Sequence, residues 1–311
     1  MGPSTERLGQ HIQAQLEAEA FDGLRQLVLK DGGIDLTLYK DRCVLRRIAV
    51  RQRACGARDL RAYLKLIARD PIERGRLVKA LTIHVSQFFR NPTTFRAIQK
   101  EVLPAILSGK RAVGGHTLRV WSAGCACGEE PYSLAVLLLA EAPVAVGKYT
   151  SAIFGTDIDP DCLRHAKAGR YPEASLAHVP ADWKRRFFVQ DGGRYHVIPA
   201  ARKLVFFKVH NILDPPPYGR IDLLVFRNVL IYMTELLQER VLLTLADALN
   251  PGGFLILGKV EGLSGAARDR FEAVNVAERI YQKPAESRSR THSLPGGRGG
   301  REHLANTGLS A

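Results

Sequence analysis

The chain has 311 residues, 46% of them apolar and 24% charged, which is ordinary for a globular protein with a substantial core. Every apolar run is shorter than the roughly 18 residues that span a bilayer, and the N-terminus has no apolar signal core, so we expect neither membrane insertion nor secretion. The five cysteines are an odd number without paired ligand spacing, which predicts a reducing, cytoplasmic location and no metal site.

The formal charge of +14 is concentrated at the N-terminus, where residues 1–100 carry 19 Lys and Arg against 10 Asp and Glu. A basic segment of this kind is either a solvated surface or the docking surface for an acidic macromolecule. Nucleic acid and an acidic protein surface both fit the charge, and charge alone does not separate them.

The first third of the sequence has helical periodicity, which predicts a helical domain over residues 1–108. Apolar residues recur three and four apart in segments 21–30, 43–53, 60–67 and 72–84, and turn signals such as Asp70-Pro71 separate them. In the second segment Val44, Leu45 and Ile48 form an apolar stripe. Arginines cover the rest of this helix as a solvated face or a docking face: Arg42, Arg46, Arg47, Arg51 and Arg53.

Residues 109–283 alternate expected strands with expected helices. The strands are 118–121, 150–156, 204–209, 221–226 and 254–258, and helices at 131–141, 160–168 and 234–249 fall between them. This alternation predicts an α/β, Rossmann-like sheet with its ligand at the carboxyl ends of the strands. Residues 171–203 predict a small antiparallel β-subdomain with a hairpin turn at 191–193. The Ser-, Arg- and Gly-rich stretch 284–311 predicts a disordered tail.

The first expected strand leads into a glycine loop, Trp121-Ser-Ala-Gly124-Cys-Ala-Cys-Gly128-Glu129-Glu130-Pro131. Glycines permit a tight turn and close approach to a ligand, and Pro131 suits the first turn of a helix. Two carboxylates at that helix end repel a phosphate and attract a cation. S-adenosyl-L-methionine carries a sulfonium and an ammonium but no phosphate, so the loop favours methyl transfer over hydride transfer.

Polar residues follow the next three expected strands. Asp157 stands where an acidic residue accepts ribose hydroxyls, whereas Asp159 is better placed to cap the following helix. Asn211 and Ile212 can bracket an adenine. Beyond the fourth strand, Asn228 can hold the methyl donor, and Tyr232 offers a hydroxyl near the reacting centre.

The segment Asp214-Pro-Pro-Pro-Tyr218 is similar to the Asp-Pro-Pro-Tyr loop of DNA methyltransferases that act on amino groups. That loop should follow the fourth strand, where a flipped base stacks on its aromatic ring. Here it follows the third strand and contains an extra proline, which favours a rigid crossover turn.

The sequence resembles the CheR-type family, the glutamate O-methyltransferases of bacterial chemotaxis receptors. The resemblance covers about residues 20–283 and is carried by motifs in order along the chain: Ser86-Gln-Phe-Phe-Arg90, Val120-Trp-Ser-Ala-Gly-Cys125, Gly128-Glu-Glu-Pro-Tyr-Ser133, Thr156-Asp-Ile-Asp159, Phe226-Arg-Asn-Val-Leu-Ile-Tyr232 and Pro251-Gly-Gly-Phe-Leu255, with Gly258 and Glu261. It implies a helical N-terminal domain, an α/β methyltransferase domain and an inserted β-subdomain.

The resemblance also implies roles for individual residues. Arg90 and Tyr232 would stand nearest the transferred methyl group as catalytic residues. The S-adenosylmethionine site would comprise His84, Ser86, Arg90, Gly124, Glu130, Asp157, Asn211, Ile212, Arg227 and Asn228. Three positions depart from the family pattern: His84 replaces an Asn, Cys127 replaces a Thr or Ser, and Lys259-Val260 replaces a small or polar pair.

The implied reaction converts receptor glutamates to methyl esters and yields S-adenosylhomocysteine. The implied partner is the acidic helical bundle of a chemoreceptor, docked on Arg42, Arg46, Arg47 and Arg53. We expect a monomer that does not bind nucleic acid, and the short hairpin turn argues against capture of a receptor's C-terminal tether peptide. The alternatives are a nucleic-acid or small-molecule methyltransferase, and a cofactor-binding scaffold without activity.

Overall fold

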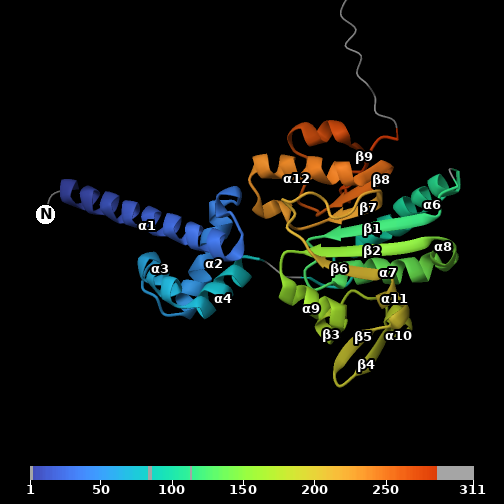
Figure 1. Ribbon diagram of the computed structural model, residues 1–311, viewed down its shortest axis with the longest axis horizontal. Coiled ribbons are helices and arrows are strands. Elements are labelled where there is room, and N and C mark those ends of the chain that lie inside the picture. Colours follow the sequence, from blue (N-terminus) through green and yellow to red (C-terminus); the bar gives the residue numbers. More distant parts are fainter. Residues whose placement is uncertain (1–2, 83–85, 113, 286–311) are drawn as a thin grey trace, which may run out of the picture.

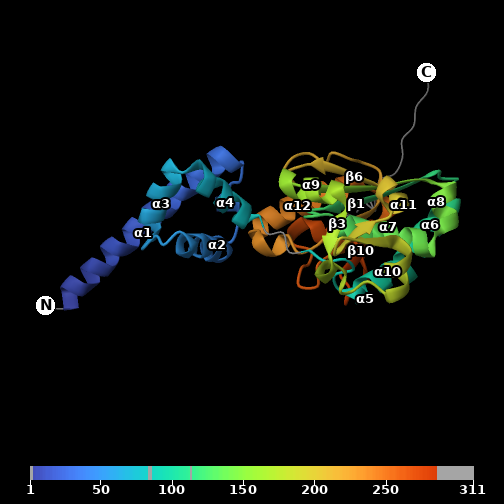
Figure 2. The same cartoon turned by 90° about the horizontal axis from the view of Figure 1, so that it is seen from below.

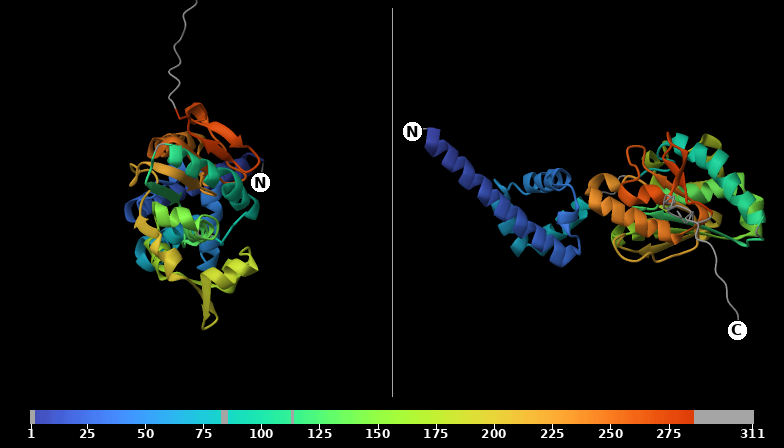
Figure 3. Two further views of the ribbon diagram at one scale, coloured as in Figure 1. Left: turned by 90° about the vertical axis from the view of Figure 1, so that its right-hand side faces the viewer. Right: turned by 90° about the horizontal axis from the view of Figure 1, so that it is seen from above.

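The structure is a computed structural model, and it describes residues 3–82, 86–112 and 114–285. A group of N-terminal helices stands beside an α/β domain, and helix α1 (Pro3–Gly32) extends away from the rest of the molecule (Figure 1). The views from below and from above show the same division (Figure 2 and Figure 3, right). No helix among the described residues combines the length and apolar content that crossing a bilayer requires.

The N-terminal group consists of α1, α2 (Asp41–Ala54), α3 (Leu60–Arg69) and α4 (Pro71–Leu81). Aspartates cap two of these helices: Asp59 accepts a hydrogen bond from a backbone N–H of α3, and Asp70 accepts two from α4. Side chains from all four helices meet in one apolar core, whose least exposed members are Leu24, Val28, Ile48, Tyr63, Ile67 and Leu77. Helix α4 was expected to reach residue 84 but ends at Leu81.

Helix α2 is held to α4 by a buried ion pair. The carboxylate of Glu73, 2% exposed, accepts hydrogen bonds from Arg51 Nε at 2.9 Å and from the Tyr63 hydroxyl at 3.0 Å. The expected apolar stripe was wrong at Leu45, which is 42% exposed. The buried face of α2 runs through positions 44, 48 and 51, and position 45 lies about 100° further around the helix.

Helices α5 (Pro92–Ala97) and α6 (Leu103–Ala112), joined by a π-helical turn at Ile98–Val102, belong to the core of the sheet domain. We had expected residues up to 108 to lie in the N-terminal domain, and the structure differs. Helical periodicity identifies the apolar face of a helix but not the domain against which that face packs. Here the apolar faces pack under the sheet through Phe95, Ile98, Val102 and Ile106.

A seven-stranded sheet forms the centre of the α/β domain, in the order β6-β2-β1-β7-β8-β10-β9. The five parallel strands are β1 (Thr117–Ala123), β2 (Thr150–Asp157), β6 (Val205–Val209), β7 (Ile221–Phe226) and β8 (Leu249–Leu257). These are the strands expected from the sequence. Strands β9 (Glu272–Asn275) and β10 (Ile280–Gln282) add an antiparallel edge that their short, half-exposed sequences did not reveal.

Helices cover both faces of the sheet, as the buried character of the central strands requires. Alternate residues of β1, β7 and β8 pack against α7 (Glu129–Glu141) on one face and α12 (Glu235–Ala248) on the other. Chain order reverses between neighbouring β1 and β7, which makes their carboxyl ends the expected ligand site. The other helices are α8 (Pro143–Lys148), α9 (Pro160–Ala168) and short 3-10 turns at Leu36–Leu38, Glu173–Leu176, Leu230–Tyr232 and Gly265–Arg270.

The insertion folds as the expected antiparallel subdomain. Strands β3 (Arg170–Pro172), β5 (Arg194–Val197) and β4 (Phe188–Asp191) form a second sheet in that order, flanked by α10 (Ala181–Phe187) and α11 (Pro199–Lys203). The β4–β5 hairpin turns on Gly192 and Gly193, which both have positive φ. Glycine pairs favour this two-residue turn because they adopt that conformation without steric cost.

Candidate active site

The loop between β1 and α7 passes through three residues with positive φ, namely Gly124 (67°), Ala126 (47°) and Gly128 (92°). A Cβ atom on Gly124 would lie 2.9 Å from Val229, and one on Gly128 would lie 2.6 Å from Ala166. Neither position has room for a side chain. The loop therefore keeps its backbone close to the neighbouring strand ends, as a ligand cradle requires.

Asp157 ends β2 with a side chain that is 8% exposed. Its Oδ2 accepts a hydrogen bond from the Ala126 backbone N–H at 2.8 Å, which ties the second strand end to the glycine loop. Asp159 instead caps α9, accepting from the Asp161 backbone N–H at 2.7 Å. The capping role expected for Asp159 is confirmed.

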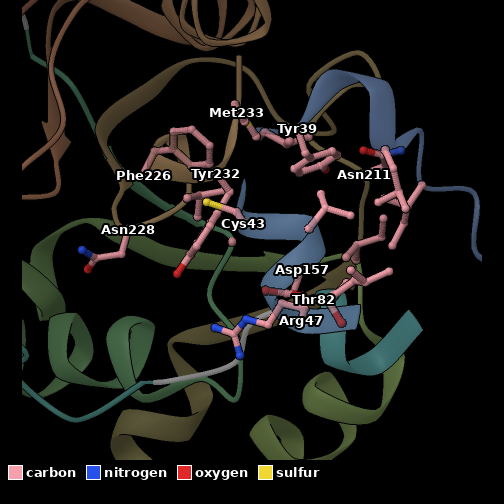
Figure 4. Close-up of a pocket in the computed structure, with 18 of the residues that line it drawn as sticks. Tyr39, Cys43, Arg47, Thr82, Asp157, Asn211, Phe226, Asn228, Tyr232 and Met233 are labelled. Atoms are coloured by element: carbon pink, nitrogen blue, oxygen red, sulfur yellow. The ribbon is translucent and has the colours of Figure 1, made fainter. Parts of the chain in front are cut away.

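Two adjoining cavities open at the strand ends and share a wall made of Gly124, Asn228 and Val229. The first lies between the sheet domain and the N-terminal helices, and among the expected site residues it is lined by Gly124, Asp157, Asn211, Ile212, Asn228 and Tyr232 (Figure 4). The second is lined by Ser86, Arg90, Glu130 and Arg227 together with the shared residues. His84 lies outside the described residues.

The N-terminal helices contribute a wall of the first cavity that we had not expected. Arg47 was assigned to the docking face with Arg42, Arg46 and Arg53, but it is only half-exposed and points into this cavity near Asp157 (Figure 4). The other three arginines are exposed. Residues 43, 44 and 47 share the face of α2 that looks toward the sheet domain. The wall consists of Ile34, Leu36, Tyr39, Cys43, Val44, Arg47, Leu81 and Thr82.

Backbone hydrogen bonds attach the N-terminal helices to the segment that carries Tyr232. The Lys40 N–H donates to the Tyr232 carbonyl at 2.9 Å, and the Thr234 N–H donates to the Leu38 carbonyl at 3.1 Å, forming a short antiparallel bridge. The wall of the first cavity and the catalytic candidate Tyr232 are thus positioned together.

A buried ion pair joins the second cavity to the start of α7. Arg227, whose side chain is 2% exposed, donates from Nη1 to Glu130 Oε2 at 3.1 Å. From Nη2 it donates to the Arg90 carbonyl at 2.8 Å and to Asn91 Oδ1 at 2.7 Å. The other oxygen of Glu130 accepts from the Ser122 hydroxyl at 2.8 Å. Sequence patterns gave Arg227 a place in the lining but did not reveal that it is the counterion of Glu130.

The segment that carries Arg90 is held by buried aromatic rings. Phe88 is fully buried and meets Tyr171 of the β-subdomain edge-on, with ring centroids 4.8 Å apart. Phe89 and Asn91, on either side of Arg90, have φ values of 52° and 62°, a region that residues other than glycine rarely occupy. The surrounding packing thus fixes an unusual backbone that presents Arg90 to the second cavity.

Glu261 organises the segment after β7. Its buried carboxylate accepts backbone hydrogen bonds from Gly258 (2.6 Å), Asn228 (2.8 Å) and Ile231 (3.3 Å). Asn228 has a φ of 63°, so this carboxylate stabilises an otherwise unfavourable turn just before Tyr232. The resemblance pointed to Glu261 as a motif position, but only the structure shows these contacts.

The loop after β6 contains the site residue Asn211, followed by a segment that lies outside the site. The Asn211 side-chain oxygen accepts from the Leu213 backbone N–H at 3.1 Å, and the residue lines the first cavity. Tyr218 stacks on Phe154 with centroids 4.0 Å apart and lines neither cavity. Residues 214–218 thus belong to the connection between β6 and β7 and lie outside both cavities, as a crossover turn would.

Two family models match almost all of this architecture. The model described as "CheR methyltransferase, SAM binding domain" matches residues 84–280, and "CheR methyltransferase, all-alpha domain" matches residues 19–82. The chain belongs to the CheR methyltransferase family. The family resemblance inferred from the motifs is confirmed, and with it the α/β fold, S-adenosylmethionine as cofactor and methyltransferase as the class of enzyme.

Individual relatives agree with the family models. A chemotaxis protein methyltransferase of Listeria innocua is 34% identical over 245 residues, covering 78% of this chain and 89% of the relative. Chemotaxis protein methyltransferase 1 of Pseudomonas aeruginosa is 32% identical over 272 residues, covering 85% and 97%. An uncharacterized 104.1 kDa protein of Rhodobacter capsulatus is 37% identical over 266 residues, but the chain spans only 28% of its length.

The two cavities of this CheR-family chain suit its cofactor chemically. Carboxylates of Glu130 and Asp157 line them, and these groups can accept hydrogen bonds from an ammonium group and from ribose hydroxyls, both of which S-adenosylmethionine carries. The buried Nε of Arg227 has no partner among the described residues, so it is available to an oxygen of a ligand. Gly124 leaves the shared wall open to a close approach.

Glu129, the first residue of α7, is 5% exposed and is not among the residues that line these cavities. Burial raises the pKa of its carboxyl group, while a hydrogen bond with Ser86 acts in the opposite direction. Its Oε2 has no hydrogen-bond partner among the described residues. An ionised Glu129 therefore costs folding free energy that a neutral side chain of the same shape would not.

We expect Glu129→Gln to raise stability more at neutral than at acidic pH. The pKa of Glu129 is about 4.5 in the unfolded chain and higher in the folded protein. Its contribution to stability is therefore fully present below pH 4.5 and is lost as pH rises through the folded pKa. The melting temperature of the variant minus that of the wild type should increase between pH 4 and 8 in calorimetry. A constant difference would contradict this, and Glu141→Gln on the exposed end of α7 is the control.

We expect Arg227→Ala to weaken S-adenosylmethionine binding at least tenfold and to destabilise the fold by about 3 kcal/mol, because it leaves Glu130 without its counterion. Arg227→Lys keeps the charge but loses the planar set of donors. Its cofactor affinity and its stability should therefore lie between those of the wild type and those of Arg227→Ala. Titration calorimetry and urea unfolding measure both effects. The exposed Arg240→Ala is the control, and a variant with wild-type cofactor affinity would refute the proposed role of the ion pair.

Proposed function

We propose that this chain transfers methyl groups from S-adenosylmethionine to glutamate carboxylates of chemotaxis receptors, forming the methyl esters of sensory adaptation. The observation that carries the proposal is the position of Arg90, in the cavity that shares a wall with the one containing Asp157 and Tyr232. A guanidinium beside the pocket of a cationic donor suits an anionic acceptor. The names of the relatives support the chemotactic setting.

We assign the cofactor contacts by chemistry. Asp157 would accept the ribose hydroxyls, and the amide of Asn211 with the side chain of Ile212 would bracket the adenine. Glu130 is the carboxylate for the cationic methionine part. The remaining members of the proposed cofactor set are His84, Ser86, Arg90, Gly124, Arg227 and Asn228, of which His84 rests on the family resemblance alone.

The proposed acceptor needs little activation. When bound, S-adenosylmethionine supplies an electrophilic methyl group on a sulfonium, and S-adenosylhomocysteine is the product. A glutamate with a pKa of about 4.3 is already ionised at neutral pH, so a carboxylate oxygen can take the methyl group without a general base. The opposite charges of carboxylate and sulfonium disappear together in the reaction, which an aligned, water-poor site favours.

In this proposal Arg90 and Tyr232 are the catalytic residues. Arg90 would hold the carboxylate through charge-assisted hydrogen bonds and direct one oxygen toward the methyl group. Tyr232 would donate a hydrogen bond from the other side of the shared wall. The strained turns beside both residues, at Phe89, Asn91 and Asn228, support precise placement because they leave the backbone few alternatives.

The outer face of α2 is the proposed receptor-docking surface. Arg42, Arg46 and Arg53 lie on it within about 40° of one another around the helix, and the exposed side chains of Leu45 and Val50 flank them on either side. A row of positive charges flanked by apolar side chains matches an acidic helical bundle, which offers carboxylates and aliphatic side chains together. Arg47 is removed from the docking set because it lines the cavity.

The β-subdomain enters the proposal as a structural support for Arg90. Its β4–β5 hairpin has a turn of only two residues, which favours recognition of receptors without capture of a C-terminal tether peptide. We further propose that the protein acts in the cytoplasm as a monomer.

We expect Arg90→Ala to lower the rate of methyl transfer to receptor fragments by about 10²-fold or more, the order of magnitude for loss of a positioning group, with a smaller change in cofactor affinity. Transfer of radiolabelled methyl and base-lability of the product measure it, because carboxyl methyl esters hydrolyse in base. Near-normal turnover, or base-stable label, would sink the assignment. DNA as acceptor in a parallel reaction tests the alternative substrate.

We expect the double reversal Arg46→Glu and Arg53→Glu to raise the KM for receptor and to reduce the salt dependence of the rate, while kcat for saturating receptor changes little. The control is the double reversal Arg111→Glu and Arg240→Glu, which changes the net charge equally on exposed residues of the sheet domain. An unchanged KM and salt dependence in the first variant would mean that α2 is merely solvated.

A further inference from the structure

Two cysteines from distant parts of the chain face one another beside the glycine loop. Cys127 lies in that loop, one residue before Gly128, and Cys162 lies in α9 after the second strand. Their sulfur atoms are 3.0 Å apart. Disulfide formation therefore needs an approach of only about 1 Å to the bond length of roughly 2.05 Å.

We propose that Cys127 and Cys162 are a modification site, a dithiol that a hydroperoxide converts to a disulfide with loss of S-adenosylmethionine affinity. The inference goes beyond the proposed reaction and does not depend on the acceptor. It concerns the loop that forms part of the cofactor site, so binding of the cofactor alone reports on it.

Cys127 has the properties of the attacking thiol. It is half-exposed, whereas Cys162 is 5% exposed and Cys125 is 2% exposed. The hydrogen bond between the two sulfur atoms lowers the pKa of Cys127, although its partial burial and then the nearby carboxylate of Glu129 oppose that shift. Cys127 also lies just before the positive end of α7, which favours a thiolate. Burial raises the pKa of Cys125 well above its usual value, which keeps that thiol inert.

The chemistry balances with a hydroperoxide as the oxidant. The Cys127 thiolate attacks the O–O bond of hydrogen peroxide, which yields a sulfenic acid and hydroxide. The Cys162 thiol then attacks the sulfenic sulfur, forming the S–S bond and releasing water. The two thiols lose two electrons and two protons in all, and the peroxide becomes two waters. A dithiol reductant reverses the reaction by exchange.

The cross-link would disturb the cofactor site because Cys127 belongs to the loop that lines it, and the Cys127 carbonyl, which accepts from the Tyr171 hydroxyl at 2.7 Å, would be pulled together with its side chain. Helix α9 is fixed by its Asp159 cap and by the buried Leu163 and Ala166. Cys127 is followed by Gly128 and preceded by Ala126, whose N–H holds Asp157. A displacement near 1 Å at Cys127 is therefore transmitted to the hydrogen bond that positions the ribose-binding carboxylate.

The test oxidises the full-length protein with hydrogen peroxide and maps the thiols by mass spectrometry. We expect a species lighter by two hydrogen atoms whose digest contains the Cys127–Cys162 cross-linked peptide. In titration calorimetry its affinity for S-adenosylmethionine should fall about tenfold or more, in line with a displacement near 1 Å in a positioned site. Dithiothreitol should restore the original affinity.

Variants separate this cysteine pair from general oxidation. Cys162→Ser should bind the cofactor normally when reduced and lose the response to peroxide, whereas Cys55→Ser should keep both the cross-link and the response. Three results would overturn the proposal: no Cys127–Cys162 cross-link, oxidation confined to Cys43 or Cys55, or a cross-linked protein with unchanged affinity. If Cys162→Ser folds poorly, the cross-link mapping and the affinity measurement on the wild-type protein still test the proposal.

Discussion

The site depends on the ion pair and the hydrogen bonds that the guanidinium of Arg227 makes. It is almost fully buried at the end of β7, and its two outer nitrogens connect Glu130 of α7 with the Arg90–Asn91 segment. Three stretches that are far apart in sequence are thereby fixed at one point. A lysine could form one of these contacts but not the planar set, because only a guanidinium presents several donors in fixed directions.

Helix α2 links the outer surface of the protein to the cofactor cavity. One face carries Arg42, Arg46 and Arg53 toward solvent, and the face about 100° further around the helix places Cys43 and Arg47 in the cavity wall. The same helical group is bonded through its backbone to the Tyr232 segment. A receptor bound on the outer face, as proposed, would thus contact the helix that also forms a wall of the cavity, so binding and the site would be physically connected.

The sequence predicted the parts of the site that follow from local pattern. The carboxyl ends of parallel strands lie at one edge of a sheet. The sequence alone therefore predicts that Gly124, Asp157, Asn211 and Asn228 lie close together. Contacts that depend on packing between distant segments could not be predicted: the wall made by α2, the three amides on Glu261, and the attachment of α5 and α6 to the sheet core. Periodicity identifies an apolar face but not its partner, which is why Leu45 and the domain boundary were misjudged.

Each of the two cavities combines a carboxylate with arginine side chains. Asp157 and Arg47 line the first cavity, and Glu130 lines the second together with Arg90 and Arg227. Arg227 and the Ser122 hydroxyl bond the two oxygens of Glu130, so the charge of this carboxylate is compensated before any ligand binds. In the proposed reaction Arg90, and not this pair, meets the acceptor carboxylate. The Arg227–Glu130 pair therefore fixes the geometry of the second cavity, a role in specificity that its net contribution to stability alone would not require.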